Sequence, residues 1–225
     1  MVWSIAHRGA RGYEPENTEL AIRKALELGA DIIEIDVQRT KDKHLVLVHD
    51  ERVWNKYRYV SIRSQPLENL RKLKLKKAQR ILTLQEALDV INKRAVINID
   101  VKGKGDYLYL YRIIMHYVLH KKWKYSQFIV SSMHKDDLLK LRRLNPRIQI
   151  GLTYYRAPKH IDKVIQTYHP YSIHLYFVSA NKNIAQKLRE RNVKFFVWTI
   201  NSRKLINKMR KFNVDGICTD YPDRI

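Results

Sequence analysis

The stretch Ile33-Glu34-Ile35-Asp36-Val37 places two carboxylates inside an otherwise apolar segment. In a β-strand, residues two positions apart point to the same face, so Glu34 and Asp36 project together and away from the three apolar side chains. Two carboxylates this close raise each other's pKa unless a cation lies between them. Carboxylates and water are the ligands that Mg²⁺ and Ca²⁺ prefer. The stretch indicates a strand that carries a divalent-cation site or, alternatively, an edge strand with one solvated polar face.

Two histidines follow apolar runs on either side of this strand. Ile5-Ala6 precede His7, which is followed by Arg8, and Val46-Leu47-Val48 precede His49. We expect both histidines at the C-terminal ends of strands, where a single histidine is more often structural than catalytic. Two of them around a carboxylate pair form an acid–base couple beside a metal, because the histidine pKa lies near neutrality. With an adjacent arginine, this arrangement is typical of phosphodiester cleavage.

Strand-like and helix-like segments alternate through the chain. The apolar patterns predict strands at 2–6, 32–37, 45–48, 95–101, 128–131, 148–152, 172–175, 195–198 and 216–218, and helices at 18–28, 84–91, 107–119, 136–144, 160–168, 184–190 and 204–211. Segment 45–48 either forms a hairpin with 32–37 or continues the same strand. The alternation indicates parallel strands with right-handed crossovers, and therefore an α/β fold, a (β/α)₈ TIM barrel. Only seven residues follow Cys218, so we expect the last outer helix to be truncated or missing.

The length favours a single domain that covers residues 1–225. Within it, residues 51–81 are polar, basic and aromatic, and they show no sustained period before Leu67. The segment is too long for an ordinary loop between a strand and a helix. We interpret it as a small insertion after the second strand, on the catalytic face of the barrel.

The net charge of +22 is unevenly placed along the chain. Residues 1–50 contain seven Lys and Arg against nine Asp and Glu, whereas residues 51–81 contain ten basic residues and two acidic ones. A basic protein favours polyanionic partners, which include phosphate-bearing substrates, anionic membrane surfaces and nucleic acids. A compositional bias without any partner is the alternative.

The remaining composition gives few further restrictions. The sequence contains no run of about 18 apolar residues and no signal-peptide pattern, so we expect a cytoplasmic protein. The single cysteine, Cys218, lies in an apolar strand, and we interpret it as a small core residue and not as a reactive thiol. The oligomeric state cannot be predicted from these features.

Several ordered motifs resemble the glycerophosphodiester phosphodiesterase family. They are His7-Arg8-Gly9, Pro15-Glu16-Asn17-Thr18, Glu34-x-Asp36, His49-Asp50, Trp198-Thr199-Ile200-Asn201 and the closing run 215–223, DGICTDYPD. The resemblance covers nearly the whole chain. It implies hydrolysis of a small phosphodiester to glycerol 3-phosphate and an alcohol, with a divalent cation that is Mg²⁺ or Ca²⁺, or else Mn²⁺.

The resemblance also implies roles for individual residues. The candidate metal ligands are Glu34, Asp36 and Asp100, the candidate acid and base are His7 and His49, and the candidate substrate-binding residues are Arg8, Lys102 and Trp198. The nucleophile would be the 2-hydroxyl of the substrate itself, which would give a cyclic phosphate on the way to the product. The sequence does not assign acid and base between the two histidines.

Some of these roles have alternatives. Asp100-Val101-Lys102 stands where the family has Glu-x-Lys, and the shorter side chain of Asp100 would reach the metal directly or through water. Without the resemblance, a local ion pair between Asp100 and Lys102 is an equal interpretation. Trp198 could contact the substrate or pack in the core. We expect Glu16 and Asn17 to support the site and to contribute to helix capping, with Asn17 or Thr18 as the N-cap of the following helix.

Two other functions remain open at this point. In the first, the same site acts on a lysophospholipid while the basic, aromatic insertion lies on an anionic membrane surface. In the second, the chain is a basic nucleic-acid-binding protein on an inactive barrel. The complete set of His7, Glu34, Asp36 and His49 argues against an inactive barrel, so nucleic acid is the partner that we least expect.

Overall fold

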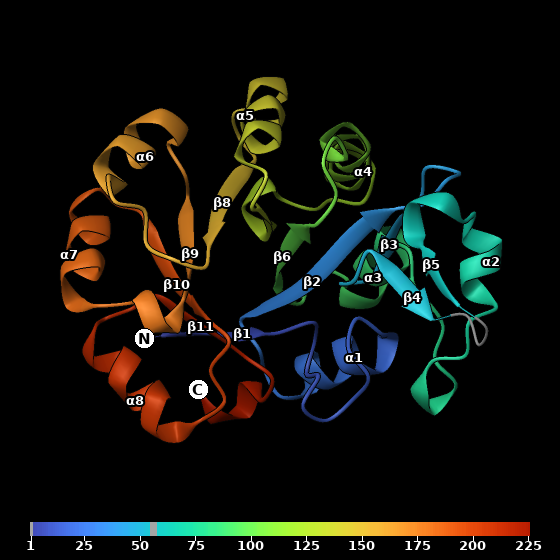
Figure 1. Ribbon diagram of the computed structural model, residues 1–225, viewed down its shortest axis with the longest axis horizontal. Coiled ribbons are helices and arrows are strands. Elements are labelled where there is room, and N and C mark those ends of the chain that lie inside the picture. The colour runs from blue at the N-terminus through green and yellow to red at the C-terminus, as the bar shows by residue number, and fades with distance from the viewer. Residues whose placement is uncertain (1, 55–57) are drawn as a thin grey trace.

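The computed structural model describes residues 2–54 and 58–225 (Figure 1). Eight parallel strands form a barrel: β1 (Trp3–Ala6), β2 (Ile32–Arg39), β6 (Val96–Val101), β7 (Phe128–Ser132), β8 (Gln149–Tyr154), β9 (Ser172–Tyr176), β10 (Lys194–Trp198) and β11 (Gly216–Thr219). β1 pairs in parallel with both β2 and β11, and this pairing closes the barrel. The predicted TIM barrel is confirmed.

Seven helices follow the barrel strands and cover its outer surface (Figure 1). They are α1 (Glu19–Glu27), α3 (Leu84–Ile91), α4 (Tyr107–His120), α5 (Lys135–Leu144), α6 (Ile161–Tyr168), α7 (Lys182–Glu190) and α8 (Arg203–Lys211), with short 3₁₀ turns η3 (Tyr125–Gln127) and η4 (Phe177–Ser179) between them. In the part of the chain that the structure describes, no helix has the length and apolar character needed to cross a membrane.

A short turn follows the last strand of the barrel. After β11 the chain forms only the 3₁₀ turn η5 (Pro222–Arg224). The hydroxyl of Ser4 on β1 donates a hydrogen bond to the carbonyl of Pro222 over 2.9 Å, so this turn lies against the first strand. Between β11 and residue 225 the chain thus forms this turn, which contacts the first strand of the barrel.

The two faces of β2 have different surroundings, because successive side chains of a strand point in opposite directions. Ile33, Ile35 and Val37 are fully buried in the layer between the barrel and its helices. Glu34 and Asp36 are buried as well, but they line a pocket at the mouth of the barrel. The apolar face of β2 thus fixes the direction in which both carboxylates point.

β2 also extends beyond the barrel. Its residues 37–39 pair antiparallel with β3 (Leu45–Leu47), so the segment that was predicted as either a hairpin or a continuation is a hairpin. The pairing places His49 just beyond β3 and beside the end of β2.

The segment 51–81 forms a compact unit next to the β2–β3 hairpin (Figure 1). It contains β4 (Arg52–Trp54), β5 (Tyr59–Ser61), η1 (Ile62–Ser64), α2 (Leu67–Arg71) and η2 (Lys76–Ala78), while residues 55–57 lie outside the described residues. Its apolar side chains pack around Val46 as a separate small core. Arg63 of this segment forms an ion pair with the buried Asp106 at 2.7 Å, which attaches the unit to the loop after β6. Arg39 of β2 pairs with the same carboxylate at 2.8 Å.

Candidate active site

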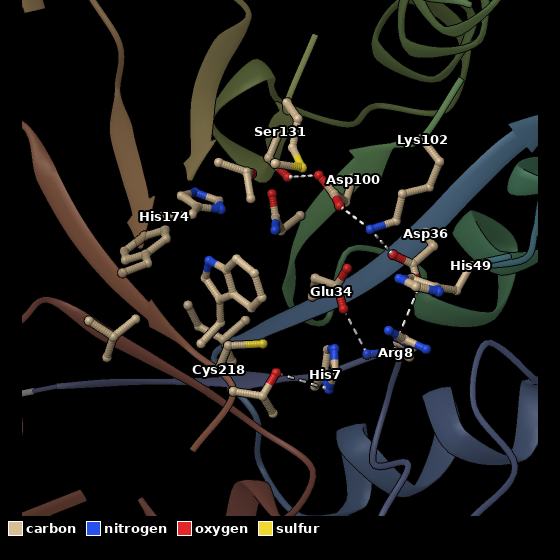
Figure 2. Close-up of a pocket in the computed structure, with 18 of the residues that line it drawn as sticks. His7, Arg8, Glu34, Asp36, His49, Asp100, Lys102, Ser131, His174 and Cys218 are labelled. Atoms are coloured by element: carbon tan, nitrogen blue, oxygen red, sulfur yellow. Dashed lines mark hydrogen bonds and ion pairs between the residues drawn. The ribbon is translucent and has the colours of Figure 1, made fainter. Parts of the chain in front are cut away.

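A pocket of about 220 Å³ opens at the carboxyl ends of the barrel strands (Figure 2). All of the candidate metal ligands, acid–base residues and substrate-binding residues contribute to its lining: His7, Arg8, Glu34, Asp36, His49, Asp100, Lys102 and Trp198. They come from four barrel strands and the β2–β3 hairpin, because parallel strands bring their carboxyl ends to the same face. Of the described residues in segment 51–81, none lines this pocket.

Three carboxylates meet inside the pocket. Asp36 on β2 and Asp100 on β6 are direct partners in the parallel pairing, and Glu34 lies two residues before Asp36 on the same face. One oxygen from each of the three lies within 4.8 Å of the others, and all three residues are at most 8% exposed. Burial, followed by the charges of Asp36 and Asp100, raises the pKa of Glu34 well above its ordinary value. A buried set of oxygen donors of this kind fits Mg²⁺ or Ca²⁺.

Two basic side chains approach these carboxylates. The Nζ atom of Lys102 lies 2.5 Å from Asp100 Oδ2 and 2.9 Å from Asp36 Oδ1, and Arg8 Nε lies 3.1 Å from Asp36 Oδ2. Burial disfavours the charge of Asp36, but Lys102 and Arg8 outweigh it and lower the pKa of this carboxyl. Glu34 has no such side-chain partner among the described residues, and its Oε2 accepts only the backbone N–H of Arg8, at 2.8 Å.

His7 is held by a carboxylate behind it. Its Nδ1–H donates to Asp220 Oδ1 over 2.7 Å, and Nε2, on the other side of the ring, has no hydrogen-bond partner among the described residues. Asp220 is itself fixed by the side-chain amide of Asn201 at 2.7 Å and by Arg11 Nε at 3.0 Å. Burial lowers the pKa of His7, and the hydrogen bond to Asp220 offsets this effect only in part. His7 is therefore neutral at pH 7, with Nε2 as a proton acceptor.

His49 lies in a more open position. Its side chain is 35% exposed, against 14% for His7, and its Nδ1 lies 2.8 Å from an oxygen of Asp50, which is 78% exposed. The side chain of Gln38 donates to the carbonyl of His49 over 2.9 Å and so ties this residue to β2. The two histidines consequently occupy different depths, His7 inside the barrel and His49 at its mouth.

A tight turn after β1 places Arg8 in the site. Arg8 and Gly9 both have positive φ, +53° and +76°. A Cβ atom on Gly9 would lie 2.6–2.8 Å from Ala21 in α1, so only glycine lets the turn pack this closely. With the turn in place, the backbone N–H of Arg8 points to Glu34, and its guanidinium contacts Asp36 and, at 2.7 Å, Glu16.

The Pro-Glu-Asn-Thr motif, residues 15–18, orients Asp36 and begins the first helix. Asn17 exchanges two hydrogen bonds with Asp36: its amide donates to Asp36 Oδ2 over 3.0 Å, and its Oδ1 accepts the backbone N–H of Asp36 over 3.1 Å. Thr18 caps α1 by accepting the backbone N–H of Ala21. The helix cap is thus Thr18, whereas Asn17 orients a carboxylate.

Trp198 both lines the pocket and packs against other aromatic rings. Its ring centroid lies 5.0 Å from that of Tyr155 and 5.4 Å from that of Tyr176. These contacts support the packing interpretation of Trp198, whereas its contact with a substrate stays a prediction.

Several polar residues of the pocket escaped the sequence analysis. The pocket is also lined by Asn98, Ser131, Thr153, His174 and Cys218. Ser131 donates to Asp100 Oδ1 over 2.9 Å, and burial lowers the pKa of His174 to about 3, so this imidazole is neutral. These residues lie on the inward face of barrel strands, and except for Thr153, which lies one residue beyond the predicted strand 148–152, the period of two could have identified them. Cys218 is buried, as expected, but it faces the pocket.

Comparisons with known proteins agree with the geometry. A profile of the glycerophosphoryl diester phosphodiesterase family matches residues 7–224. A glycerophosphodiester phosphodiesterase of Caldanaerobacter subterraneus subsp. tengcongensis is 34% identical over 98% of this chain and 95% of the relative, and one of Bacillus altitudinis is 31% identical over 100% and 96%. A phosphodiesterase of Oleispira antarctica, solved in complex with the product sn-glycerol-3-phosphate, superimposes with a TM-score of 0.88 at 25% identity, over 98% of this chain and 94% of that one.

The repulsion among the carboxylates leads to a prediction for Glu34→Gln. The pKa of Glu34 in the folded protein lies above its ordinary 4.5, so the folded state favours the protonated carboxyl. The stability that protonated Glu34 contributes is fully present below pH 4.5 and is lost as pH rises through the folded-state pKa. We expect the neutral variant, in EDTA, to become increasingly more stable than the wild type as pH rises above 4.5. Urea unfolding at several pH values measures this difference. Parallel pH profiles of the two proteins would contradict it.

Proposed function

Because the chain belongs to the glycerophosphoryl diester phosphodiesterase family of enzymes, we propose that it hydrolyses glycerophosphodiesters to sn-glycerol 3-phosphate and an alcohol in a metal-dependent reaction. The observation that carries this proposal is the convergence of three buried carboxylates, two histidines and two basic side chains in one pocket. The bound product in the Oleispira antarctica relative supports glycerol phosphate as the part of the substrate that stays in the pocket.

Glu34, Asp36 and Asp100 would hold the divalent cation, and Mg²⁺, Ca²⁺ and Mn²⁺ all suit a set of oxygen donors. A cation at this position supplies neutralisation of the phosphate charge. Arg8 and Lys102 already lie beside these carboxylates, and they would bind the remaining phosphate oxygens, Arg8 through its planar fork and Lys102 as a point charge.

The two histidines would divide the proton transfers. We assign the base to His7, because burial keeps its ring neutral and the hydrogen bond to Asp220 leaves Nε2 as the acceptor. His7 would take the proton of the substrate's 2-hydroxyl while this oxygen forms a bond to phosphorus and the bond from phosphorus to the alcohol breaks. His49 would donate a proton to the departing alcohol, which leaves through the mouth where His49 lies.

The second half of the reaction reverses these roles. His49 would accept a proton from a water molecule that attacks the cyclic phosphate, and His7 would return its proton to the 2-oxygen as that bond breaks. Each histidine then regains its starting state, and the products are glycerol 3-phosphate and the free alcohol.

Replacement of either histidine tests this assignment. We expect His7→Ala and His49→Ala each to lower turnover by roughly two to four orders of magnitude, which is the usual effect of a positioned acid or base. A p-nitrophenyl ester of glycerol phosphate needs no acid for its leaving group, so the first step, measured as the initial release of p-nitrophenolate, should be restored in His49→Ala alone. His116→Ala, on the exposed surface of α4, is the control. Rescue of both variants, or of neither, contradicts the division of roles.

Calorimetry with Mg²⁺ and Ca²⁺ tests the metal ligands separately from catalysis. We expect Asp36→Ala to abolish tight binding of the cation, because it removes a ligand and not core volume. Asp100→Ala should weaken cation binding less than Asp36→Ala does if Asp100 contacts the cation through water, and by the same amount if Asp100 contacts it directly. An unchanged affinity in Asp36→Ala would remove the proposed site.

A second candidate substrate is a lysophospholipid at an anionic membrane surface. The observation that favours it is the β4–β5 hairpin, on which Trp54 and Tyr59 are direct cross-strand partners with exposures of 54% and 63% and ring centroids 5.2 Å apart. Exposed aromatic rings next to basic residues such as Arg52 are typical of proteins that bind at a membrane interface.

The double variant Trp54→Ala, Tyr59→Ala distinguishes this candidate from the first. If the hairpin contacts a membrane, the variant should lose binding to phosphatidylserine vesicles and activity on lysophospholipid, while it keeps its activity on soluble glycerophosphocholine. The matched control is Leu119→Ala, which removes an exposed apolar side chain far from the hairpin in sequence, on α4. Equal vesicle binding by wild type and double variant would exclude the membrane role.

A further inference from the structure

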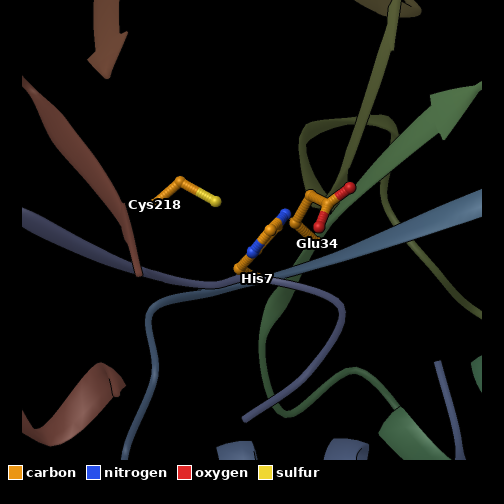
Figure 3. A group of neighbouring side chains, drawn as sticks. All are labelled: His7, Glu34 and Cys218. Atoms are coloured by element: carbon orange, nitrogen blue, oxygen red, sulfur yellow. The ribbon is translucent and has the colours of Figure 1, made fainter. Parts of the chain in front are cut away.

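A second group of metal-binding side chains lies next to the three carboxylates. His7, Glu34 and Cys218 each direct one donor atom to a common space, and these atoms lie within 4.8 Å of one another (Figure 3). The residues come from neighbouring parts of the barrel, because β1, which ends just before His7, pairs with both β2 and β11. Glu34 therefore belongs to two possible donor sets, one of oxygens alone and one of nitrogen, oxygen and sulfur.

We propose that His7 Nε2, a Glu34 carboxylate oxygen and Cys218 Sγ form a second site, for Zn²⁺ or another thiophilic divalent ion, and that such an ion inhibits the enzyme by occupying His7. The inhibition rests on the function proposed above, whereas the binding of the ion does not.

The donor set distinguishes this site from the carboxylate cluster. Zn²⁺ binds cysteine, histidine and carboxylate ligands, whereas Mg²⁺ and Ca²⁺ select oxygen. Bond lengths of about 2.0–2.3 Å around a tetrahedral zinc ion bring neighbouring donor atoms to roughly 3.5 Å from each other. The three atoms are close enough that small side-chain rotations would achieve this, and the pocket leaves the fourth position to water.

The surroundings of the ligands already have the arrangement of a metal site. A histidine that binds a metal usually donates its other ring N–H to a carboxylate, which fixes the tautomer and the ring orientation. His7 does so to Asp220, over 2.7 Å. The carboxylate of Glu34 is oriented by the backbone N–H of Arg8. Two of the three ligands are thus held in place by hydrogen bonds of their own.

Cys218 completes the set from the apolar side of the pocket. It is 6% exposed and packs in the interior cluster with Ile5 and Phe196, but it also lines the pocket. Metal binding would replace the thiol proton, which passes to water, by a bond from sulfur to the ion. The reaction needs no oxidant, so it is reversible by a chelator.

Two consequences for the proposed reaction follow. An ion on Nε2 of His7 uses the lone pair that would accept the proton of the substrate, so the base is lost. Because Glu34 is shared, the ion would also weaken binding of Mg²⁺ or Ca²⁺ at the carboxylate cluster. The enzyme would then respond to the ratio of thiophilic to hard divalent ions.

Cadmium binding tests the site without any assay of activity. The chain has one cysteine, so the ultraviolet charge-transfer absorption of a cadmium–thiolate bond can arise only at Cys218. The protein is used without a tag and with His116→Gln and His120→Gln, because these exposed rings lie 5.1 Å apart on α4 and could bind the ion themselves. We expect the band to saturate at one Cd²⁺ per chain and to be absent after Cys218→Ser. Asp220→Asn should weaken binding about 10–100-fold.

Zn²⁺ titration of diesterase activity at fixed Mg²⁺ tests the inhibition in the same background. Cys218→Ser should require at least about 10–100-fold more Zn²⁺ for half inhibition. Loss of a residue that hydrogen-bonds to a metal ligand lowers metal affinity by this factor, and loss of a ligand itself should lower the affinity at least as much. Cys218→Val serves the same purpose if the buried hydroxyl impairs folding. Absence of the cadmium band, or equal zinc inhibition of wild type and both variants, would overturn the proposal. If no diester is hydrolysed, the proposed function fails, and the cadmium titration still decides the metal site.

Discussion

Electrostatic repulsion among Glu34, Asp36 and Asp100 is the constraint that organises this end of the barrel. Three carboxylates at most 8% exposed would be strongly unfavourable together without compensation. Lys102 lies between two of them, and Arg8 supplies both a guanidinium to Asp36 and a backbone N–H to Glu34. The positive φ of Arg8 and the close packing of the next residue against α1 are therefore parts of the same compensation.

Much of this arrangement could be predicted from the sequence, because it depends on local periodicity. Alternation along β2 predicted the shared face of Glu34 and Asp36, and the repeated strand–helix pattern predicted the barrel that brings His7 and Asp100 to one mouth. The contact between His7 and Asp220 could not be predicted in this way. It joins residues 213 positions apart and depends on the register between β1 and β11, which no local pattern specifies.

The net charge is a second case in which the sequence alone gave an incomplete picture. Residues 51–81 carry ten basic residues, but several of these form ion pairs: Arg71 and Arg80 with Glu86, and Lys77 with Glu14. Arg63 is likewise bound to Asp106. The number of charged residues contributes to the electrostatic potential around the molecule. These four basic side chains, however, also attach the segment to the barrel through their ion pairs.

The order in which the chain is synthesised gives the β1–β11 pairing a further importance. His7 is synthesised 213 residues before its partner Asp220, so the imidazole cannot be oriented until the chain has been made past β11. Closure of the barrel is likewise a contact of very high sequence separation, which is intrinsically slow to form. A nascent chain that ends before β11 can form much of the hydrophobic core and still lacks the hydrogen bond that fixes His7, so this imidazole is oriented only when the barrel closes.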